Sequence, residues 1–202
     1  MKKYAANFPN CGYIVNEFSQ KELAPIWNEV NKIQHNFNKS ETIDHSFTST
    51  VKKEYKIIDS LAHLESLILP FTQIYNHNFE FNQPDTRYSL TSAWVNFQEA
   101  GEFFSPHTHV GEFSFALYMQ VPFLIEDEKL HLSTTDKKIE AAAGFLFYYN
   151  SALGEIRPQY IAVDKSWENS MIFFPGSMLH SVQPFFTSKE YRITISGNLV
   201  RT

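Results

Sequence analysis

Two histidines separated by one residue are the side chains in this sequence best suited to metal chemistry. His107 and His109 stand in the segment Gly101-Glu-Phe-Phe-Ser-Pro-His-Thr-His. On a β-strand, residues two apart point to the same face, so both imidazoles would enter one cavity while Thr108 faces away. Pro106 fixes the backbone just before the pair, and Gly101 marks a turn. Taken alone, the pair could equally be two polar residues of a solvated strand.

A third histidine follows about 70 residues later, in the segment Phe173-Phe-Pro-Gly-Ser-Met-Leu-His180. An apolar strand ends there in a Pro-Gly turn, and His180 comes after it in a strand-like context. Imidazole is a common ligand of iron, zinc and copper in proteins. The sequence therefore predicts a metal site that is formed by His107, His109 and His180.

An arginine on the last apolar segment is the candidate for binding an acid. Arg192 and Thr194 alternate with β-branched residues in Glu190-Tyr-Arg-Ile-Thr-Ile-Ser. An unpaired buried charge costs several kcal/mol, so an arginine on such a strand either lies at an exposed edge or meets an anion. The guanidinium group matches the geometry of a carboxylate. Together with three metal-type histidines, Arg192 favours a site for a carboxylic acid.

The first 80 residues predict two helices that brace these segments. Ser19 and Glu22 form a capping-box pattern at the start of the first helix. Apolar residues then recur at helical spacing, and the positions between them are expected to face solvent. The apolar positions are Leu23, Ile26, Val30, Ile33 and Phe37, and the solvent positions are Lys21, Glu29, Lys32 and Asn36. A second helix begins near Asp59 or Ser60 and reaches Tyr75, with Pro70 expected to bend or interrupt it.

From residue 88 onward, short β-branched and aromatic runs alternate with turn residues, which is typical of a β-sandwich or barrel. The predicted strands are 88–97, 107–121, 144–150, 170–174 and 191–200. The polar segments 126–143 and 153–168 predict no particular structure. We expect one domain over 1–202, in which a helical support region (1–85) packs against one face of a β core (86–202).

The composition narrows the class of protein. Hydrophobic residues make up 43% of the 202 residues and charged residues 19%, as in a globular domain. The net charge of -5 argues against binding to nucleic-acid phosphates. Cys11 is the only cysteine, and no segment has the ~20 apolar residues of a membrane span. These features predict a cytoplasmic protein without a membrane partner.

The order of these motifs resembles the Fe(II)/2-oxoglutarate-dependent oxygenase superfamily, over about residues 94–200. In that superfamily, a His-x-Asp/Glu pair, a distal histidine and an arginine or lysine on the following strand form the cofactor site. Here, Pro106-His107 is similar to the approach to the first ligand, and Pro175-Gly176 to the approach to the distal ligand. Arg192-x-Thr194 is similar to the family's Arg-x-Ser/Thr pair. The segment Pro-His-Thr-His, followed by Gly-Glu-Phe-Ser, resembles most closely a poorly characterised branch of this superfamily from bacteria and their phages.

The sequence departs from the family pattern at one ligand. Where most members have an acidic residue, this chain has His109. Either the site uses three imidazoles, or Glu112 supplies the carboxylate of the usual two-histidine, one-carboxylate arrangement. On an undistorted strand Glu112 would face away from His109, although Gly111 could permit a bulge. We expect three histidines.

The resemblance implies a double-stranded β-helix, a jelly-roll of the cupin-like kind, and a non-haem dioxygenase. Fe(II) would be the metal, 2-oxoglutarate the co-substrate and molecular oxygen the oxidant. Arg192 and Thr194 would bind the far carboxylate of 2-oxoglutarate, and Tyr118 and Asn96 would hydrogen-bond the keto acid. The reaction would be hydroxylation of a substrate, small or macromolecular, that the sequence does not identify. Two alternatives stay open: a cupin-type metal enzyme that does not use 2-oxoglutarate, and a non-catalytic jelly-roll binding module.

Overall fold

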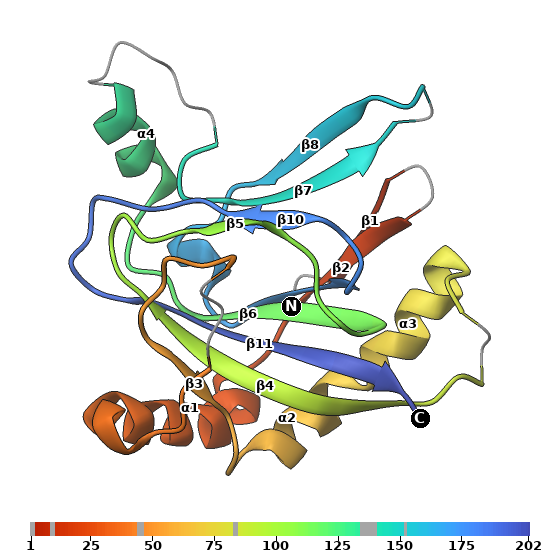
Figure 1. Ribbon diagram of the computed structural model, residues 1–202, viewed down its shortest axis with the longest axis horizontal. Coiled ribbons are helices and arrows are strands. Elements are labelled where there is room, and N and C mark those ends of the chain that lie inside the picture. The colour runs from red at the N-terminus through yellow and green to blue at the C-terminus, as the bar shows by residue number, and fades with distance from the viewer. Residues whose placement is uncertain (1–2, 9–10, 44–46, 83–84, 134–140, 152) are drawn as a thin grey trace.

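The protein is built from two antiparallel β-sheets that lie face to face, with helices on the outer side of the larger one (Figure 1). The computed structural model describes residues 3–8, 11–43, 47–82, 85–133, 141–151 and 153–202. The larger sheet has seven strands in the order β1-β2-β9-β6-β11-β4-β3, and the smaller has four in the order β5-β10-β7-β8. This architecture confirms the predicted jelly-roll fold with N-terminal helices.

The strands of the larger sheet are β1 (Lys3–Phe8), β2 (Cys11–Glu17), β3 (Glu54–Lys56), β4 (Tyr88–Gln98), β6 (Phe113–Gln120), β9 (Ser170–Pro175) and β11 (Arg192–Arg201). Those of the smaller sheet are β5 (Phe104–His107), β7 (Phe145–Asn150), β8 (Ile156–Ile161) and β10 (His180–Val182). The helices are α1 (Gln20–His35), α2 (Leu61–Ile68), α3 (Pro70–Phe79) and α4 (Ile125–Ser133).

The central strands of the larger sheet are buried on both faces, which explains their nearly continuous apolar sequences. On β9, Met171 and Phe173 join a cluster beneath the helices, whereas Ile172 and Phe174 join a cluster between the two sheets. Successive side chains of a strand point to opposite faces, so one apolar run serves two cores. The layer between the sheets is the one that contains the candidate site.

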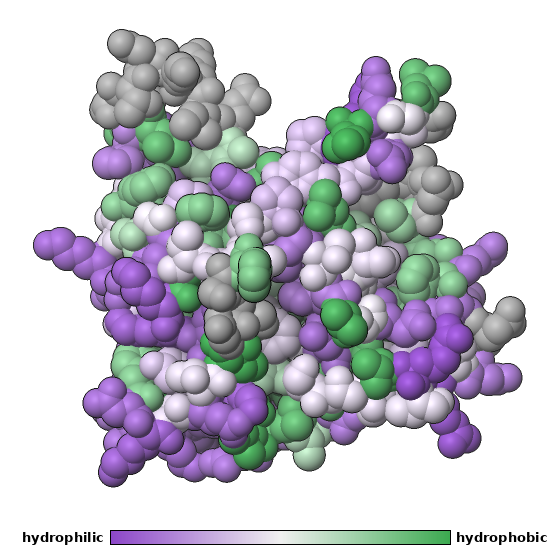
Figure 2. All heavy atoms as spheres, viewed as in Figure 1, coloured by the Kyte–Doolittle hydropathy of each residue, from purple (hydrophilic) through white to green (hydrophobic). Residues whose placement is uncertain are grey.

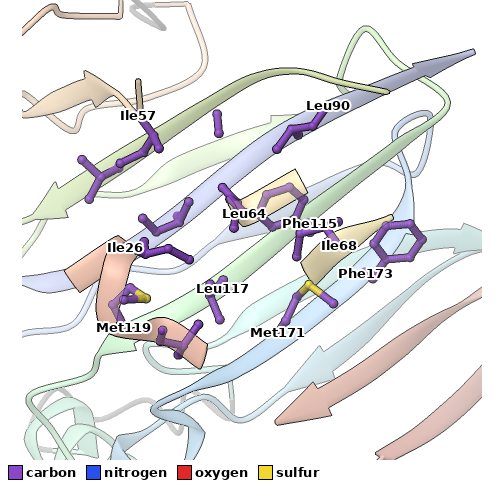
Figure 3. Packing of buried hydrophobic residues seen from close by; sticks show 14 of the residues in the cluster. Ile26, Ile57, Leu64, Ile68, Leu90, Phe115, Leu117, Met119, Met171 and Phe173 are labelled. Atoms are coloured by element: carbon purple, nitrogen blue, oxygen red, sulfur yellow. The ribbon is translucent and has the colours of Figure 1, made fainter. Parts of the chain in front are cut away.

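The helical layer covers the outer face of the larger sheet. Ile26 of α1 and Leu64 and Ile68 of α2 pack onto Leu117 of β6 and Met171 of β9 (Figure 3). The helix α1 begins as predicted: Ser19 accepts a hydrogen bond from the Glu22 amide, and the Glu22 carboxylate accepts one from the Ser19 amide. This reciprocal capping satisfies donors that the first helical turn would otherwise leave unpaired.

One position on α1 differs from the prediction. Glu29 was expected to face solvent, but its side chain is buried, with 6% of its surface exposed. One carboxylate oxygen accepts the amides of Ile58 and Asp59, and the other accepts the amide and hydroxyl of Ser60. These donors belong to the turn that leads into α2, and Ser60 is the residue that caps this helix. Glu29 therefore caps a neighbouring helix, a role that the spacing within α1 could not indicate.

The second predicted helix is interrupted at the proline, as expected. The helix α2 ends at Ile68, and α3 begins at Pro70, where a proline is tolerated because the first turn needs no amide donor. Both α2 and α3 pack on the outer face of the larger sheet.

The strand predictions were correct for the central strands and wrong for one segment. The segment 107–121 was predicted as one strand, but it divides into the end of β5, a loop over 108–112, and β6. The two unassigned segments contain α4 and β8. The first 85 residues, expected to be a helical support region, also contribute β1, β2 and β3 to the larger sheet.

The surface seen in Figure 2 mixes polar residues with small, separate groups of apolar ones. Three exposed apolar residues lie near the ends of β5 and β10. Val110 is in the loop after β5, Leu179 comes directly before β10, and Phe47 is close to Ser49, which pairs with Phe104 of β5. Within the residues that the structure describes, no helix is both long and apolar enough to cross a membrane.

Candidate functional site

Three imidazoles meet at one end of the space between the sheets. His107 ends β5, His180 begins β10, and the two residues are direct partners in the pairing of these strands. His109 lies in the loop that follows β5, not on a strand. The ring centroids are 4.3 Å apart for His107 and His180, 5.1 Å for His107 and His109, and 5.0 Å for His109 and His180. One nitrogen from each ring lies within 4.8 Å of the others, a spacing that suits a single metal ion.

Backbone carbonyls orient two of the three rings. Nδ1 of His107 lies 2.7 Å from the Ser105 carbonyl oxygen, and Nδ1 of His180 lies 2.8 Å from that of Met178. A carbonyl oxygen can only accept, so Nδ1 carries the proton and Nε2 carries the lone pair in both rings. This is the arrangement that metal-binding histidines usually have.

The third imidazole depends on a close contact between two loops. The amide of His109 donates to the carbonyl of Gly176, 2.8 Å away. A Cβ at position 176 would lie 2.5 Å from the carbonyl oxygen of Gly111, so only glycine allows this approach. The Pro175-Gly176 turn thus brings the loop of His109 beside His180.

Burial keeps the site suited to neutral imidazoles. His180 is 3% exposed and stacks on Phe145, with ring centroids 5.2 Å apart. The pKa of His180 is lowered well below its usual value, first by desolvation and then by the neighbouring His107 and His109. Metal ligation requires the deprotonated nitrogen, so this environment favours the binding form of the ring.

Glu112, the alternative ligand, lies outside this group. Its carboxylate forms an ion pair with Arg201, 3.4 Å away, and accepts a hydrogen bond from Asn82. Its backbone amide donates to the carbonyl of Leu199, which fixes the residue against β11. The structure therefore brings His109 to the other two histidines and directs Glu112 to the end of β11.

A cavity of about 270 Å³ extends from the histidines between the sheets. Its polar walls come from alternate residues of neighbouring strands: Asn96 and Gln98 of β4, Tyr118 of β6, and Thr194 and Ser196 of β11. Its aromatic walls include Trp94, Phe104, Phe145 and Phe174. None of the described residues that line it is acidic.

The predicted acid-binding arginine lies in the same layer. Arg192 is 1% exposed, and its guanidinium carbon lies 5.8 Å from the ring centroid of Phe123 and 5.6 Å from that of Phe185, two rings that stack on each other. Its acceptors are Gln98 Oε1, at 3.0 Å from Nε and 2.6 Å from Nη2, the Ala143 carbonyl at 2.7 Å from Nη1, and the Gln183 carbonyl at 2.9 Å from Nη2. All are uncharged, and within the described ranges no ion pair includes Arg192.

Desolvation lowers the pKa of Arg192 to about 10, against opposing effects of Tyr118 and Glu128. The guanidinium group is therefore still protonated near neutral pH. A buried cation with uncharged partners attracts an anion strongly, because little solvent screens it. The predicted site requires both a metal-binding group and a cation, and the buried charge of Arg192 supplies the cation.

Three more of the predicted residues surround the cavity near Arg192. The Asn96 amide donates to the Thr194 hydroxyl oxygen at 3.3 Å, so the Thr194 hydrogen can be donated elsewhere. The buried Oδ1 of Asn96 has no hydrogen-bond partner among the described residues. Burial raises the pKa of Tyr118, and the charge of Arg192 opposes that rise, so the phenol and the guanidinium interact. All three side chains line the same cavity.

Sequence reasoning missed Gln98, the residue that contacts Arg192 through two hydrogen bonds. A signal was available, because Gln98 follows Asn96 by two residues and therefore lies on the same face of β4. The carbonyls of Ala143 and Gln183 could not be predicted, since they come from loops whose path depends on the whole fold. Trp167 packs against Tyr118 with ring centroids 6.0 Å apart and is not among the described residues that line the cavity.

Comparisons with known proteins agree with this geometry. Residues 92–198 match the family model described as "Putative 2OG-Fe(II) oxygenase", which is more than half of the chain. No curated protein matches the chain by sequence.

Solved structures show the same fold at low sequence identity. A prolyl-4-hydroxylase from Pseudomonas putida has a TM-score of 0.62 at 11% identity, covering 95% of this chain and 94% of its own. The non-haem α-ketoglutarate-dependent epimerase SnoN, from nogalamycin biosynthesis, has a TM-score of 0.58 at 11% identity, covering 95% and 77%. HygX from Streptomyces hygroscopicus, solved with nickel and 2-oxoglutarate bound, has a TM-score of 0.51 at 10% identity, covering 96% and 85%.

The donor set fits the cofactors of this family: three imidazole nitrogens suit Fe(II), and a buried cation next to a residue that lines the cavity suits a carboxylate. The chain belongs to the 2OG-Fe(II) oxygenase family, whose cofactors are Fe(II) and 2-oxoglutarate.

Proposed function

We propose that the protein is a non-haem Fe(II)/2-oxoglutarate-dependent dioxygenase that hydroxylates a C–H bond of its substrate. The observation that carries the proposal is that three imidazoles lie on the same cavity as side chains that surround a buried guanidinium group, which forms no ion pair within the described ranges. A binding site for a keto acid between a metal and a cation needs both features.

In this proposal, His107 and His180 would hold Fe(II) through Nε2, and His109 would supply one nitrogen of its ring. With both cofactors bound, the site supplies oxidative chemistry in which oxygen and 2-oxoglutarate become succinate, carbon dioxide and the hydroxyl group of the product. The carbonyls of Ser105 and Met178 keep two of the imidazoles in the required tautomer.

The far carboxylate of 2-oxoglutarate would bind near Arg192. Within the described residues, one hydrogen of Nη1 is left for a further acceptor, and the hydroxyl groups of Thr194 and Tyr118 face the same cavity. Asn96 holds Thr194 in place, because its amide group donates a hydrogen bond to the Thr194 hydroxyl oxygen. The aromatic walls exclude water, which strengthens each of these interactions.

The test is an anaerobic titration in two steps. The metal-free protein is titrated with Fe(II), and the loaded protein is then titrated with 2-oxoglutarate while its visible absorption is recorded. We expect one iron per chain and a new charge-transfer band that saturates with 2-oxoglutarate. Iron binding without a response to 2-oxoglutarate would instead indicate the cupin-type enzyme, and the absence of iron binding would indicate a non-catalytic module.

Matched variants make the result specific. His180→Ala should abolish stoichiometric iron binding, because it removes one of three ligands. His35→Ala removes an exposed histidine at the end of α1 and should bind iron as the parent does. With oxygen admitted, the parent but not His180→Ala should form succinate from 2-oxoglutarate, measured by mass spectrometry.

A further inference from the structure

Gln98 lies between the cavity and the buried guanidinium group. It faces Arg192 directly in the pairing of β4 with β11. Gln98 is among the residues that line the cavity, whereas Arg192 is not among the described ones that do so. The electrostatic attraction of Arg192 for a molecule in the cavity therefore depends on the charge of the side chain at position 98.

The hydrogen bonds fix the orientation of this amide. Gln98 Nε2 donates to the carbonyl of Glu102, 2.5 Å away, so Oε1 is turned toward Arg192. Oε1 then accepts from both Nε and Nη2 of the guanidinium group. This edge of an arginine side chain is one that a carboxylate commonly occupies. Gln98 thus takes the geometrical place of a carboxylate without its charge.

We propose that Gln98 is a positioning residue that makes the site selective for dicarboxylic keto acids, because its neutral amide fixes the guanidinium group and leaves the positive charge available to the distal carboxylate. The inference rests on the proposed function, in which Arg192 receives that carboxylate. Selectivity for 2-oxoglutarate over a keto acid with one carboxylate then depends on the charge at position 98 as well as on Arg192.

Other groups near Arg192 do not replace this role. Glu128 affects Arg192 electrostatically, but its carboxylate is hydrogen-bonded to the amides of Phe186 and Thr187 and to the Thr187 hydroxyl. Tyr118 is buried, and desolvation raises the pKa of its phenol, so it stays neutral near physiological pH. Gln98 is the direct partner whose charge a single substitution of the same shape can change.

The experiment compares two isosteric replacements. Gln98→Glu keeps an acceptor for Arg192 but adds a negative charge, and Gln98→Met removes the acceptor and adds none. Gln120→Glu makes the same charge change on β6, where the amide donates to the Tyr191 carbonyl, and serves as the control. Each Fe(II)-loaded protein is titrated anaerobically with 2-oxoglutarate and with pyruvate, which lacks the distal carboxylate.

Gln98→Glu should weaken 2-oxoglutarate binding by about 10- to 100-fold, the size of a lost charge-assisted interaction. Its affinity for pyruvate and for iron should stay within a few-fold of the parent. Gln98→Met should lose only a few-fold, because the cation remains. Both variants lose the donation to the Glu102 carbonyl, so a role that depends only on the acceptor for Arg192 predicts the opposite order, because Glu preserves that acceptor and Met does not. The Gln120→Glu control should match the parent with both keto acids.

Two results would overturn the inference: Gln98→Glu binding 2-oxoglutarate as tightly as the parent, or losing pyruvate and 2-oxoglutarate equally. If Gln98→Glu does not fold, Gln98→Met decides. It must keep most of the parent's preference for 2-oxoglutarate over pyruvate, and a loss as complete as that of Arg192→Met refutes the inference. If the parent itself does not bind 2-oxoglutarate, the proposed function fails instead, so the two failures are distinguishable.

Discussion

Replacing Arg192 by methionine is the sharpest test of the acid-binding end of the cavity. The substitution keeps an unbranched side chain of moderate length and removes the charge. Arg192 is 1% exposed and donates to three uncharged acceptors, and among the described residues no ion pair neutralises its charge, although buried Glu128 interacts with it from farther away. A buried charge-assisted hydrogen bond contributes about 1.5–3 kcal/mol, and we therefore expect 2-oxoglutarate binding to weaken by about 10- to 100-fold.

Stability should fall as well, and it is measured separately. Burying the guanidinium group costs desolvation energy, and the variant avoids this cost, but it leaves Gln98 Oε1 and the Ala143 and Gln183 carbonyls without their donor. An unsatisfied buried group costs about 1–3 kcal/mol, and the saved desolvation energy offsets part of the sum. The unfolding midpoint should therefore fall by several degrees, since about 1 kcal/mol corresponds to roughly 2–4 °C in a chain of this size.

The assay is the anaerobic titration of Fe(II)-loaded protein with 2-oxoglutarate, followed through its charge-transfer band. Iron stoichiometry, measured separately, should stay at the parent value because Arg192 contacts none of the three histidines through a described hydrogen bond. Unchanged affinity for 2-oxoglutarate would refute the assignment of Arg192. Loss of iron together with 2-oxoglutarate would show that the residue acts on the whole fold.

Three further predictions concern the metal ligands and the helical layer. His109→Ala should lose stoichiometric iron while Glu112→Ala keeps it, as measured by metal analysis after desalting, and the reverse result would make Glu112 the ligand. Glu29→Leu leaves several amides at the start of α2 unpaired and should lower the free energy of unfolding by about 2–4 kcal/mol in urea; a change below 1 kcal/mol would contradict the capping role. The pKa of Glu22 is lowered by its hydrogen bonds with Ser19, so its stabilising effect is present above pH 4.5 and is lost as the pH falls through the lower folded value. In acid titrations followed by circular dichroism, Glu22→Gln should therefore lose less stability than the parent over that range, and parallel curves would disprove the coupling.

Local patterns predicted the parts of the fold that depend on neighbouring residues. The capping box of Ser19 and Glu22, the interruption at Pro70 and the apolar runs of β4, β6, β9 and β11 each depend on residues close together in the sequence. Such patterns decide secondary structure because hydrogen bonding and side-chain periodicity act over a few residues. The three histidines and Arg192 were found in the same way, from residue type and spacing.

His109 lies beside His107 and His180, but strand alternation is not the cause. Alternation on one strand was expected to direct His107 and His109 to the same side, but the strand ends at His107. The hydrogen bond between the His109 amide and the Gly176 carbonyl holds the loop instead, and it joins segments far apart in the sequence. No local pattern encodes such a contact. The burial of Glu29 was not predicted for the same reason, since the donors that it binds lie about 30 residues away, in the turn before α2.

The charges of the site suggest why electrostatics matters here more than hydrogen-bond geometry. The neutral His109 stands where the family usually has an acid, and the described lining of the cavity has no carboxylate, so the charge of a bound Fe(II) would stay uncompensated until an acid arrives. At the other end, Gln98 and two carbonyls already occupy four of the N–H groups of Arg192, which leaves little room for a bidentate contact. Attraction of a dianion must then come mainly from the net positive charge at both ends. For this reason a charge-changing substitution at position 98 should weaken 2-oxoglutarate binding more than one that removes a hydrogen-bond acceptor there.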